Sequence, residues 1–251
     1  MTDLDLDDGP AYAAAVGGLI GALGGGFMIS SQAKAFSKDN GLRGREAYVL
    51  GRGSVLGDVD ADVVTAAFGF WPADIIRAAW NGGRAVMSPA AARPLYVEVC
   101  RDWGRTRYAE FADAGRLADL LTPVVDGIDV EGLPLFAGWR AIDLPGDDTG
   151  RLSQQLQALR EHRGGVHLVA VIASGLRPHQ AVLAGPGGSD NATFFGYEEP
   201  FEDISHLRGT RHAAEDLTNK IAAPAYDALG RDERSEALQL LQAAAHAAFR
   251  R

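Results

Sequence analysis

Apolar residues recur at helical spacing along most of the chain. Leu152, Leu156 and Leu159 follow an i, i+4, i+7 spacing that places their side chains on one face of a helix. Alternation of the kind typical of a β-strand occurs only near 192–197. We therefore expect a mainly α fold. Other segments with helical spacing are 60–68, 72–80, 88–101, 107–121, 214–221 and 238–249.

The segment 152–185 has the outline of a helix-turn-helix unit. Gly164 and Gly165 predict a break after a first helix, because glycine is a poor helix former. A second helix is expected over 166–173 and a short third helix over 178–183, separated by a Gly-Leu turn. In a winged helix, the residues that follow, 185–200, would form a β-hairpin.

A turn-rich connector, 143–150, divides the chain into two expected parts. The first part is an N-terminal, helix-turn-helix-like half over 1–145. The second is a winged-helix-like half with terminal helices over 146–251. The pattern predicts two helix-turn-helix-like halves packed together, with at most a small β-wing.

The charge balance argues against nucleic acid as the partner. The net charge is -9, whereas DNA-binding proteins normally carry a basic surplus for phosphate contacts. The third helix offers only Arg177, His179 and Gln180 for base edges, which is a small polar set. Residues 151–183 hold four arginines against one glutamate, a local +3 (4 − 1) that a solvated helix face also explains.

The cysteine content and the N-terminus indicate an intracellular protein. Cys100 is the single cysteine and stands in an apolar stretch, so we expect a buried, inert thiol and a reducing cytoplasm. The acidic start does not resemble a secretory signal. The apolar run Ala13–Ile29 contains six glycines, and we expect a buried helix there rather than a membrane span.

Three side chains that can carry acid-base chemistry gather at the predicted break. His162 is assigned as a proton carrier, Arg163 as the holder of an anion or carbonyl, and His167 as a second acid-base or orienting group. The alternative is that His162 and Arg163 stabilise a helix C-terminus through its dipole, and that His167 is a core residue.

Aromatic residues that could line an apolar cavity come before this segment. We expect Phe68, Phe70 and Trp71 to bind ligand, together with Tyr48 and Arg52. The alternative is that the aromatic residues belong to the core. The sequence contains no metal-binding motif and no glycine-rich phosphate loop, so no metal and no cofactor is expected.

Three segments in this order resemble a known family. They are GREAYVLGRGSVLGDVDADVVTAAFGFWP (44–72), LREHRGGVHLVAVIASGL (159–176) and LTNKIAAPAYDALG (217–230). The chain is similar to the SalK-like, helix-turn-helix-type family of actinobacteria, whose members recur in polyketide and polyether biosynthesis clusters. The resemblance implies the fold and associates the chain with natural-product biosynthesis.

The chain departs from this family at two places. Relatives often have Tyr-Asn-Phe where this chain has Gly69-Phe70-Trp71, and Gly-Asp-Gly where it has Gly164-Gly165-Val166. A polar side chain is missing at both places. We therefore expect a more apolar ligand or a different activity.

The leading hypothesis is a cytoplasmic protein that binds a small hydrophobic, polyketide-like metabolite. Acid-base chemistry by a cofactor-independent enzyme, such as an isomerase or cyclase, would suit the two histidines and the arginine. The alternative is a ligand-responsive helix-turn-helix transcription regulator, and a third class is a structural or partner-binding protein. A second copy of the chain, in a homodimer, is a further candidate partner.

Overall fold

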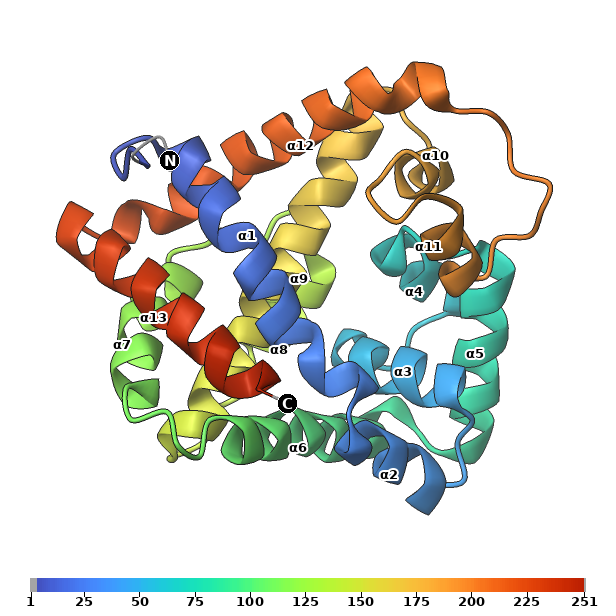
Figure 1. The fold of residues 1–251 in the computed structure, drawn as a ribbon. Coiled ribbons are helices and arrows are strands. Elements are labelled where there is room, and N and C mark those ends of the chain that lie inside the picture. Colours follow the sequence, from blue (N-terminus) through green and yellow to red (C-terminus); the bar gives the residue numbers. More distant parts are fainter. Residues whose placement is uncertain (1–3, 251) are drawn as a thin grey trace.

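The computed structural model describes residues 4–250 and is built from helices, with no strand in that range. This confirms the expected mainly α fold (Figure 1). The α-helices are α1 (Gly9–Gly25), α2 (Ser31–Asp39), α3 (Gly44–Gly53), α4 (Ala61–Phe68), α5 (Ala73–Val86), α6 (Pro89–Arg107), α7 (Ala114–Asp126), α8 (Pro134–Arg140), α9 (Asp148–Ala173), α10 (Pro178–Leu183), α11 (Gly188–Phe195), α12 (Arg208–Ala222) and α13 (Arg231–Phe249). Short 3-10 turns are η1 (Gly26–Ile29), η2 (Ser54–Leu56), η3 (Ser205–Leu207) and η4 (Ala223–Ala228).

The longest helix, α9, runs through the middle of the molecule and is covered by α1, α6, α7, α8 and α12 (Figure 1). Asp147 caps it by accepting a hydrogen bond from the Gly150 N–H at 2.7 Å. The first half of α9 is buried around most of its circumference, so its polar side chains need internal partners. Ser153 donates to the carbonyl of Cys100 at 2.8 Å, and Gln155 donates to the Thr122 hydroxyl at 2.8 Å.

The glycines of α1 allow that helix to lie directly on α9. A Cβ at Gly24 would stand 2.4 Å from the carbonyl oxygen of Leu156, and one at Gly17 would stand 2.7 Å from the Arg163 guanidinium. The backbone contact at Gly24 excludes any side chain, whereas the Arg163 side chain could move away from one at Gly17. Close packing of α1 on α9 therefore requires glycine at Gly24, as expected for a buried helix.

By length and composition, the stretch Gly9–Asp39 could also cross a membrane, and it is the one such helix found within the described residues. A core helix of a globular fold passes the same test. In this structure Tyr12, Val16, Ile20 and Leu23 of α1 are fully buried against neighbouring helices.

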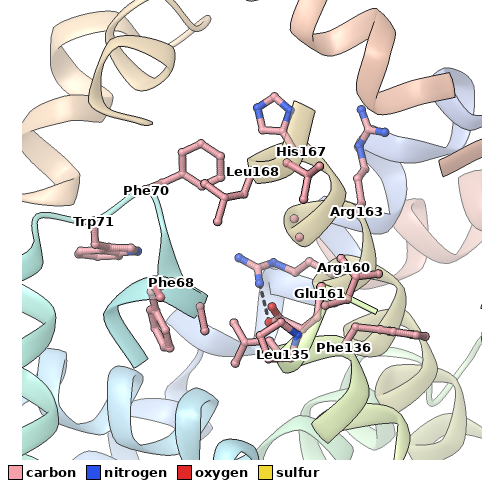
Figure 2. A pocket seen from close by; sticks show the side chains of 18 of the residues that line it. Phe68, Phe70, Trp71, Leu135, Phe136, Arg160, Glu161, Arg163, His167 and Leu168 are labelled. Atoms are coloured by element: carbon pink, nitrogen blue, oxygen red, sulfur yellow. Dashed lines mark hydrogen bonds and ion pairs between the residues drawn. The ribbon is translucent and has the colours of Figure 1, made fainter. Parts of the chain in front are cut away.

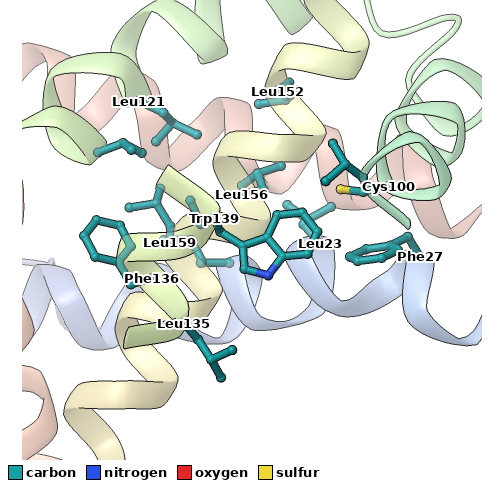
Figure 3. Packing of buried hydrophobic residues seen from close by; sticks show 14 of the residues in the cluster. Leu23, Phe27, Cys100, Leu121, Leu135, Phe136, Trp139, Leu152, Leu156 and Leu159 are labelled. Atoms are coloured by element: carbon teal, nitrogen blue, oxygen red, sulfur yellow. The ribbon is translucent and has the colours of Figure 1, made fainter. Parts of the chain in front are cut away.

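A single large hydrophobic cluster joins the N-terminal helices to α9 and the C-terminal helices. Trp139 of α8 lies within it, close to Leu156 of α9 and Leu23 of α1 (Figure 3). Its indole N–H donates to the Arg52 carbonyl at 3.3 Å. Cys100 is also buried here, and burial raises the pKa of its thiol to about 12, in agreement with the expected inert cysteine.

The boundary expected between 145 and 146 falls in the loop that precedes α9. The same hydrophobic cluster continues on both sides of that loop. A smaller cluster, formed by Val171, Leu176, Ala181 and Ala214, ties the end of α9 to α10 and α12.

The predicted helix break at Gly164 and Gly165 is wrong. Both glycines lie inside α9, which continues without interruption to Ala173. Each costs about 1 kcal/mol relative to alanine in a helix interior. Packing of α9 against five neighbouring helices outweighs this cost. Glycine at 165 also makes room for the Leu133 side chain, since a Cβ there would stand 2.6 Å from its terminal Cδ2 methyl group.

Two further local expectations are wrong. The segment 192–197 is not a strand, because Ala192 to Phe195 end the helix α11, which Gly196 terminates in the left-handed conformation (φ 97°). The helix expected over 107–121 begins later, at Ala114, and continues through Pro123 to Asp126. The short third helix over 178–183 is confirmed as α10.

Candidate functional site

A cavity of about 890 Å³ lies beside the second half of α9. Its walls come from α9, from α3 and α4, from the start of α8, and from α11 and α12. Figure 2 shows aromatic side chains on one side and the charged side chains of α9 on the other. The cavity is partly open to solvent.

The turn after α4 supplies the aromatic wall. Gly69 has a φ of 58° that glycine adopts readily, and a Cβ there would stand 2.5 Å from Leu168. This tight turn directs Phe70 and Trp71 to the cavity (Figure 2). The Trp71 ring lies 4.8 Å from the Phe195 ring of α11, so α11 covers this side.

The floor of the cavity holds a buried ion pair. Arg52 donates from Nε and Nη2 to the two carboxylate oxygens of Glu161, both at 2.7 Å. Its Nη1 donates to the Tyr48 hydroxyl at 3.0 Å, and its guanidinium lies 4.4 Å from the centre of the Phe68 ring. This bidentate geometry compensates two charges that are almost completely removed from water.

The ionised form of Glu161 is stabilised despite its burial. Burial by itself would raise the pKa of the carboxyl, but the charge and hydrogen bonds of Arg52 outweigh it and hold the pKa below its usual range. Gln157 adds a hydrogen bond at 2.7 Å and Arg160 adds one at 3.1 Å. At the floor, the Glu161 carboxylate is therefore ionised and held in place by its hydrogen bonds.

A second network forms the wall between α9 and α12. Glu215 of α12 accepts hydrogen bonds from Arg163 and, at 2.9 Å, from Arg211. Arg163 also donates to the side-chain oxygen of Asn219 at 3.0 Å. Both arginines thus already have a carboxylate partner, although they line the cavity.

Hydrogen bonding fixes the tautomer of His167. The Thr218 hydroxyl lies 2.7 Å from the Ala214 carbonyl oxygen, to which it donates, and 2.8 Å from Nδ1 of His167. Since the hydroxyl has one proton, Nδ1–H must be the donor in the second contact. The neutral imidazole therefore carries its lone pair on Nε2.

His167 is neutral near physiological pH. Burial, reinforced by the charge of Arg211 and opposed by that of Glu215, lowers its pKa to about 4. The ring stacks on Phe70, with centroids 5.4 Å apart and planes inclined by 22°. A neutral, oriented imidazole of this kind can accept a proton or a hydrogen bond.

The structure does not bring His162 to this cavity. Because α9 is continuous, five residues at about 100° each place His162 about 140° away from His167 around the helix. His162 is buried on the other side of α9, with its ring 5.5 Å from the Phe136 ring. This corrects the sequence-based hypothesis: the two histidines do not meet at a glycine break, and His162 is not placed to carry a proton at this site.

The other side chains predicted for the site do come together around this cavity. Seven of the eight line the cavity: Arg163, His167, Phe68, Phe70, Trp71, Arg52 and Tyr48. Their possible contact with a ligand stays a prediction. The aromatic residues are also partly structural, since the Phe68 side chain is buried under Arg52.

Sequence reasoning missed five charged groups that line the cavity: Arg160, Glu161, Glu215, Arg211 and Asp62. A signal for the first two was present: 157, 160, 161, 164 and 168 share one face of an unbroken helix. The assumed break at the glycines concealed that face. Glu215 is brought to the cavity by the packing of α12 on α9, for which the local pattern contains no signal.

The remaining chemistry-bearing groups lie elsewhere. No cluster of metal-ligating side chains occurs among residues 4–250. His179 and Gln180 of α10 both contact the Glu202 carboxylate, at 3.1 and 3.2 Å, and Arg177 approaches the same group at 3.9 Å. The polar side chains of the short third helix are therefore gathered around an acidic residue.

Comparison with known proteins agrees with the helical architecture. No curated protein and no solved structure matches the chain. A family model described as "Helix-turn-helix family" matches residues 15–197, which include the aromatic turn, all of α9 and α10. Because this match covers well over half of the 251 residues, the chain belongs to the helix-turn-helix family.

Proposed function

We propose that this protein binds a small apolar molecule in the cavity beside α9. The observation that carries the proposal is the cavity itself: about 890 Å³, walled largely by aromatic and aliphatic side chains, with a few oriented polar groups. This combination is characteristic of small-molecule sites. The resemblance to the SalK-like family supports a polyketide-like metabolite as the ligand.

The mouth of the cavity also favours an apolar ligand. Val63, Val169 and Ile172 line it and are largely exposed, with Ile172 59% accessible. Burial of such surface by a ligand contributes about 25 cal/mol per Å² of apolar area before the costs of binding. A ligand that extends from the aromatic wall to this rim would remove these side chains from water.

Filling the cavity tests the proposal. A Cβ at Gly164 meets no atom within 4 Å, and Gly164 lines the cavity, so Gly164→Phe should place its ring in the ligand space. Gly18 on α1 is also unobstructed but lies outside the cavity, which makes Gly18→Phe a matched control. The probe is N-phenyl-1-naphthylamine, a neutral apolar dye whose fluorescence rises on binding.

We expect the dye to bind the wild type and the Gly18→Phe variant, and Gly164→Phe to weaken binding by about tenfold or more, which corresponds to about 1.4 kcal/mol. Circular dichroism should show equal helicity for all three proteins. Equal dye affinity in all three would mean that this cavity is not the binding site.

A catalytic use of the same cavity is a second candidate, favoured by His167. Its Nε2 lone pair could take a proton from a carbon next to a carbonyl group of the ligand. Return of that proton to another carbon of the ligand would complete an isomerisation without a cofactor. Uptake of solvent deuterium by 2-acetylnaphthalene, lost in His167→Asn, would support this use. No uptake with the wild type would remove it, without affecting the binding proposal.

A regulatory use is a third candidate and is favoured by the family match. In that case the same cavity would bind an effector, and α10 would approach DNA. The contacts of the α10 side chains with Glu202 argue against this use. A measurement of DNA binding by the whole protein would test it.

A further inference from the structure

Arg160 differs from the other arginines of the cavity in the number of hydrogen-bond donors that it leaves unused. Its guanidinium projects into the cavity from α9 (Figure 2). Its stem lies against α1, where a Cβ at Gly24 would stand 2.9 Å from the Arg160 Cβ and one at Gly25 would stand 3.0 Å from its Nε. Within residues 4–250, the only hydrogen bond of its side chain runs from Nη1 to Glu161, at 3.1 Å. A guanidinium has five N–H donors, so most of them remain for a ligand.

Glu161 cannot neutralise Arg160 by itself. The same carboxylate accepts two hydrogen bonds from Arg52 and one from Gln157. Its single negative charge is therefore shared between two guanidinium groups, and Arg52 makes the closer, bidentate contact. One positive charge is left at the cavity floor.

The balance over the whole cavity has the same sign. Arg163 and Arg211 share the single carboxylate of Glu215, while Asp62 at the mouth is paired with Arg77 outside it. The walls carry four cationic and three anionic side chains, and because Asp62 is paired outside the cavity, two glutamates remain for the four arginines. The cavity is therefore positively charged in a chain of net charge -9. The charged residues are Arg52, Arg160, Arg163, Arg211, Asp62, Glu161 and Glu215.

We propose that the ligand of this cavity is an apolar carboxylate and that Arg160 binds its carboxylate group. The proposal rests on the proposed small-molecule function and specifies its ligand class. The planar fork of a guanidinium matches the two oxygens of a carboxylate. The apolar body of the ligand would then lie between Phe70 and Trp71 on the opposite wall and Leu168 on α9 itself (Figure 2).

The geometry favours a carboxylate over a phosphate. A phosphate ester carries up to two negative charges and more acceptor oxygens, whereas Arg160 is the one arginine of this site with a single side-chain hydrogen bond. Arg163 and Arg211 each make two, and Arg52 makes three. The guanidinium with the most unused donors matches a single carboxylate group. Arg163, which the sequence suggested as the anion holder, is already bound by Glu215 and Asn219.

Two ligands of the same shape but different charge test this assignment. Naphthalene-2-carboxylate and its neutral amide, naphthalene-2-carboxamide, are titrated by calorimetry at pH 7.5 into the wild type, Arg160→Gln and Arg93→Gln. Arg93 is exposed on α6, away from the cavity, so its replacement makes the same change of net charge. Circular dichroism confirms that each variant is folded.

We expect the wild type to bind the carboxylate about tenfold or more tightly than the amide, as is typical of a charge-assisted hydrogen bond. Arg160→Gln should remove that preference by weakening carboxylate binding while leaving amide binding within about twofold. Arg93→Gln should change neither affinity.

Each other outcome overturns a defined part of the argument. If the wild type binds both ligands equally, or if Arg160→Gln leaves the preference intact, the carboxylate assignment is wrong but the small-molecule site stands. If the wild type binds neither ligand and Gly164→Phe does not affect the dye, both proposals fail. The wild-type preference needs no variant, so a misfolded Arg160→Gln would still leave the assignment testable.

Discussion

His162 and His167 show how burial on one helix produces two different roles from one residue type. His162 is enclosed beside Phe136, and burial together with the neighbouring charge of Arg163 lowers its pKa to about 4. His167 has a similarly lowered pKa but lies at the cavity wall with an assigned donor, Nδ1–H. Their environments, rather than their spacing, separate a core residue from a candidate site residue.

The lowered pKa of His162 predicts that the fold loses stability in mild acid. In the unfolded chain a histidine binds a proton below a pH of about 6.5, whereas folded His162 does so only near 4. Between these values the unfolded state binds more protons. The free energy of unfolding therefore falls by about 1.4 kcal/mol for each pH unit by which the pH is lowered, for each such group. His167 acts in the same direction.

Urea unfolding of the wild type and His162→Gln between pH 4 and pH 7 measures this effect. The variant should show a pH slope smaller by about one proton over the range 4 to 6.5, whatever its absolute stability. An unchanged slope would mean that His162 is protonated in the folded protein and that its environment differs from the one described.

At the scale of the element, α9 determines the site because it is unbroken. Arg160, Gly164, His167 and Leu168 share a face only in a continuous helix. Gly164 leaves open space on that face, and Gly165 admits Leu133. The pair of glycines thus shapes the cavity and the packing of α9, rather than ending the helix.

Two identical substitutions in helices should have opposite effects on stability. Gly164→Ala adds a methyl group where nothing lies within 4 Å and should raise the free energy of unfolding by about 0.5 to 1 kcal/mol. Gly24→Ala should lower it, by more than about 1 kcal/mol, because its Cβ would stand 2.4 Å from a backbone oxygen of α9.

Thermal and urea unfolding provide both values. A loss of stability in Gly164→Ala would indicate that α9 is interrupted at the glycines, as the local sequence pattern suggests. A neutral Gly24→Ala would indicate that α1 and α9 are less closely packed than described.

At the scale of the whole molecule, the cavity and the chain as a whole carry charge of opposite sign. The chain is acidic overall, yet the cavity walls carry a positive surplus. In α10, by contrast, His179 and Gln180 contact the Glu202 carboxylate, which occupies polar groups that a DNA-reading helix would need. This distribution favours an anionic small molecule over DNA.

We therefore expect no specific DNA binding at physiological salt. Footprinting on mixed genomic fragments should show no protected site with an affinity of about 10⁻⁸ M or tighter, the range of specific regulators. A reproducible footprint that disappears in Arg177→Ala, an exposed residue at the start of α10, would instead establish the regulatory use.

The sequence by itself determined the helical class, the starts of α4, α5, α6 and α10, and the residue types of the site. Local signals sufficed for α4 and α6: both follow the expected starts, and Ser88 caps α6 by accepting a hydrogen bond from Ala91 N–H at 3.2 Å. Aromatic residues between Phe68 and Trp71 were also recognised, because their types are visible without any knowledge of packing.

Only the tertiary structure decided how α9 continues and which groups it presents. Local propensity disfavours glycine by about 1 kcal/mol at each position, but the surrounding helices add packing energy that no window of sequence contains. That continuity moves His162 to the core and Arg160 to the cavity. The packing of α12 on α9 then adds Glu215 and Thr218, more than fifty residues from Arg163 and His167, because the site is assembled from contacts between distant segments.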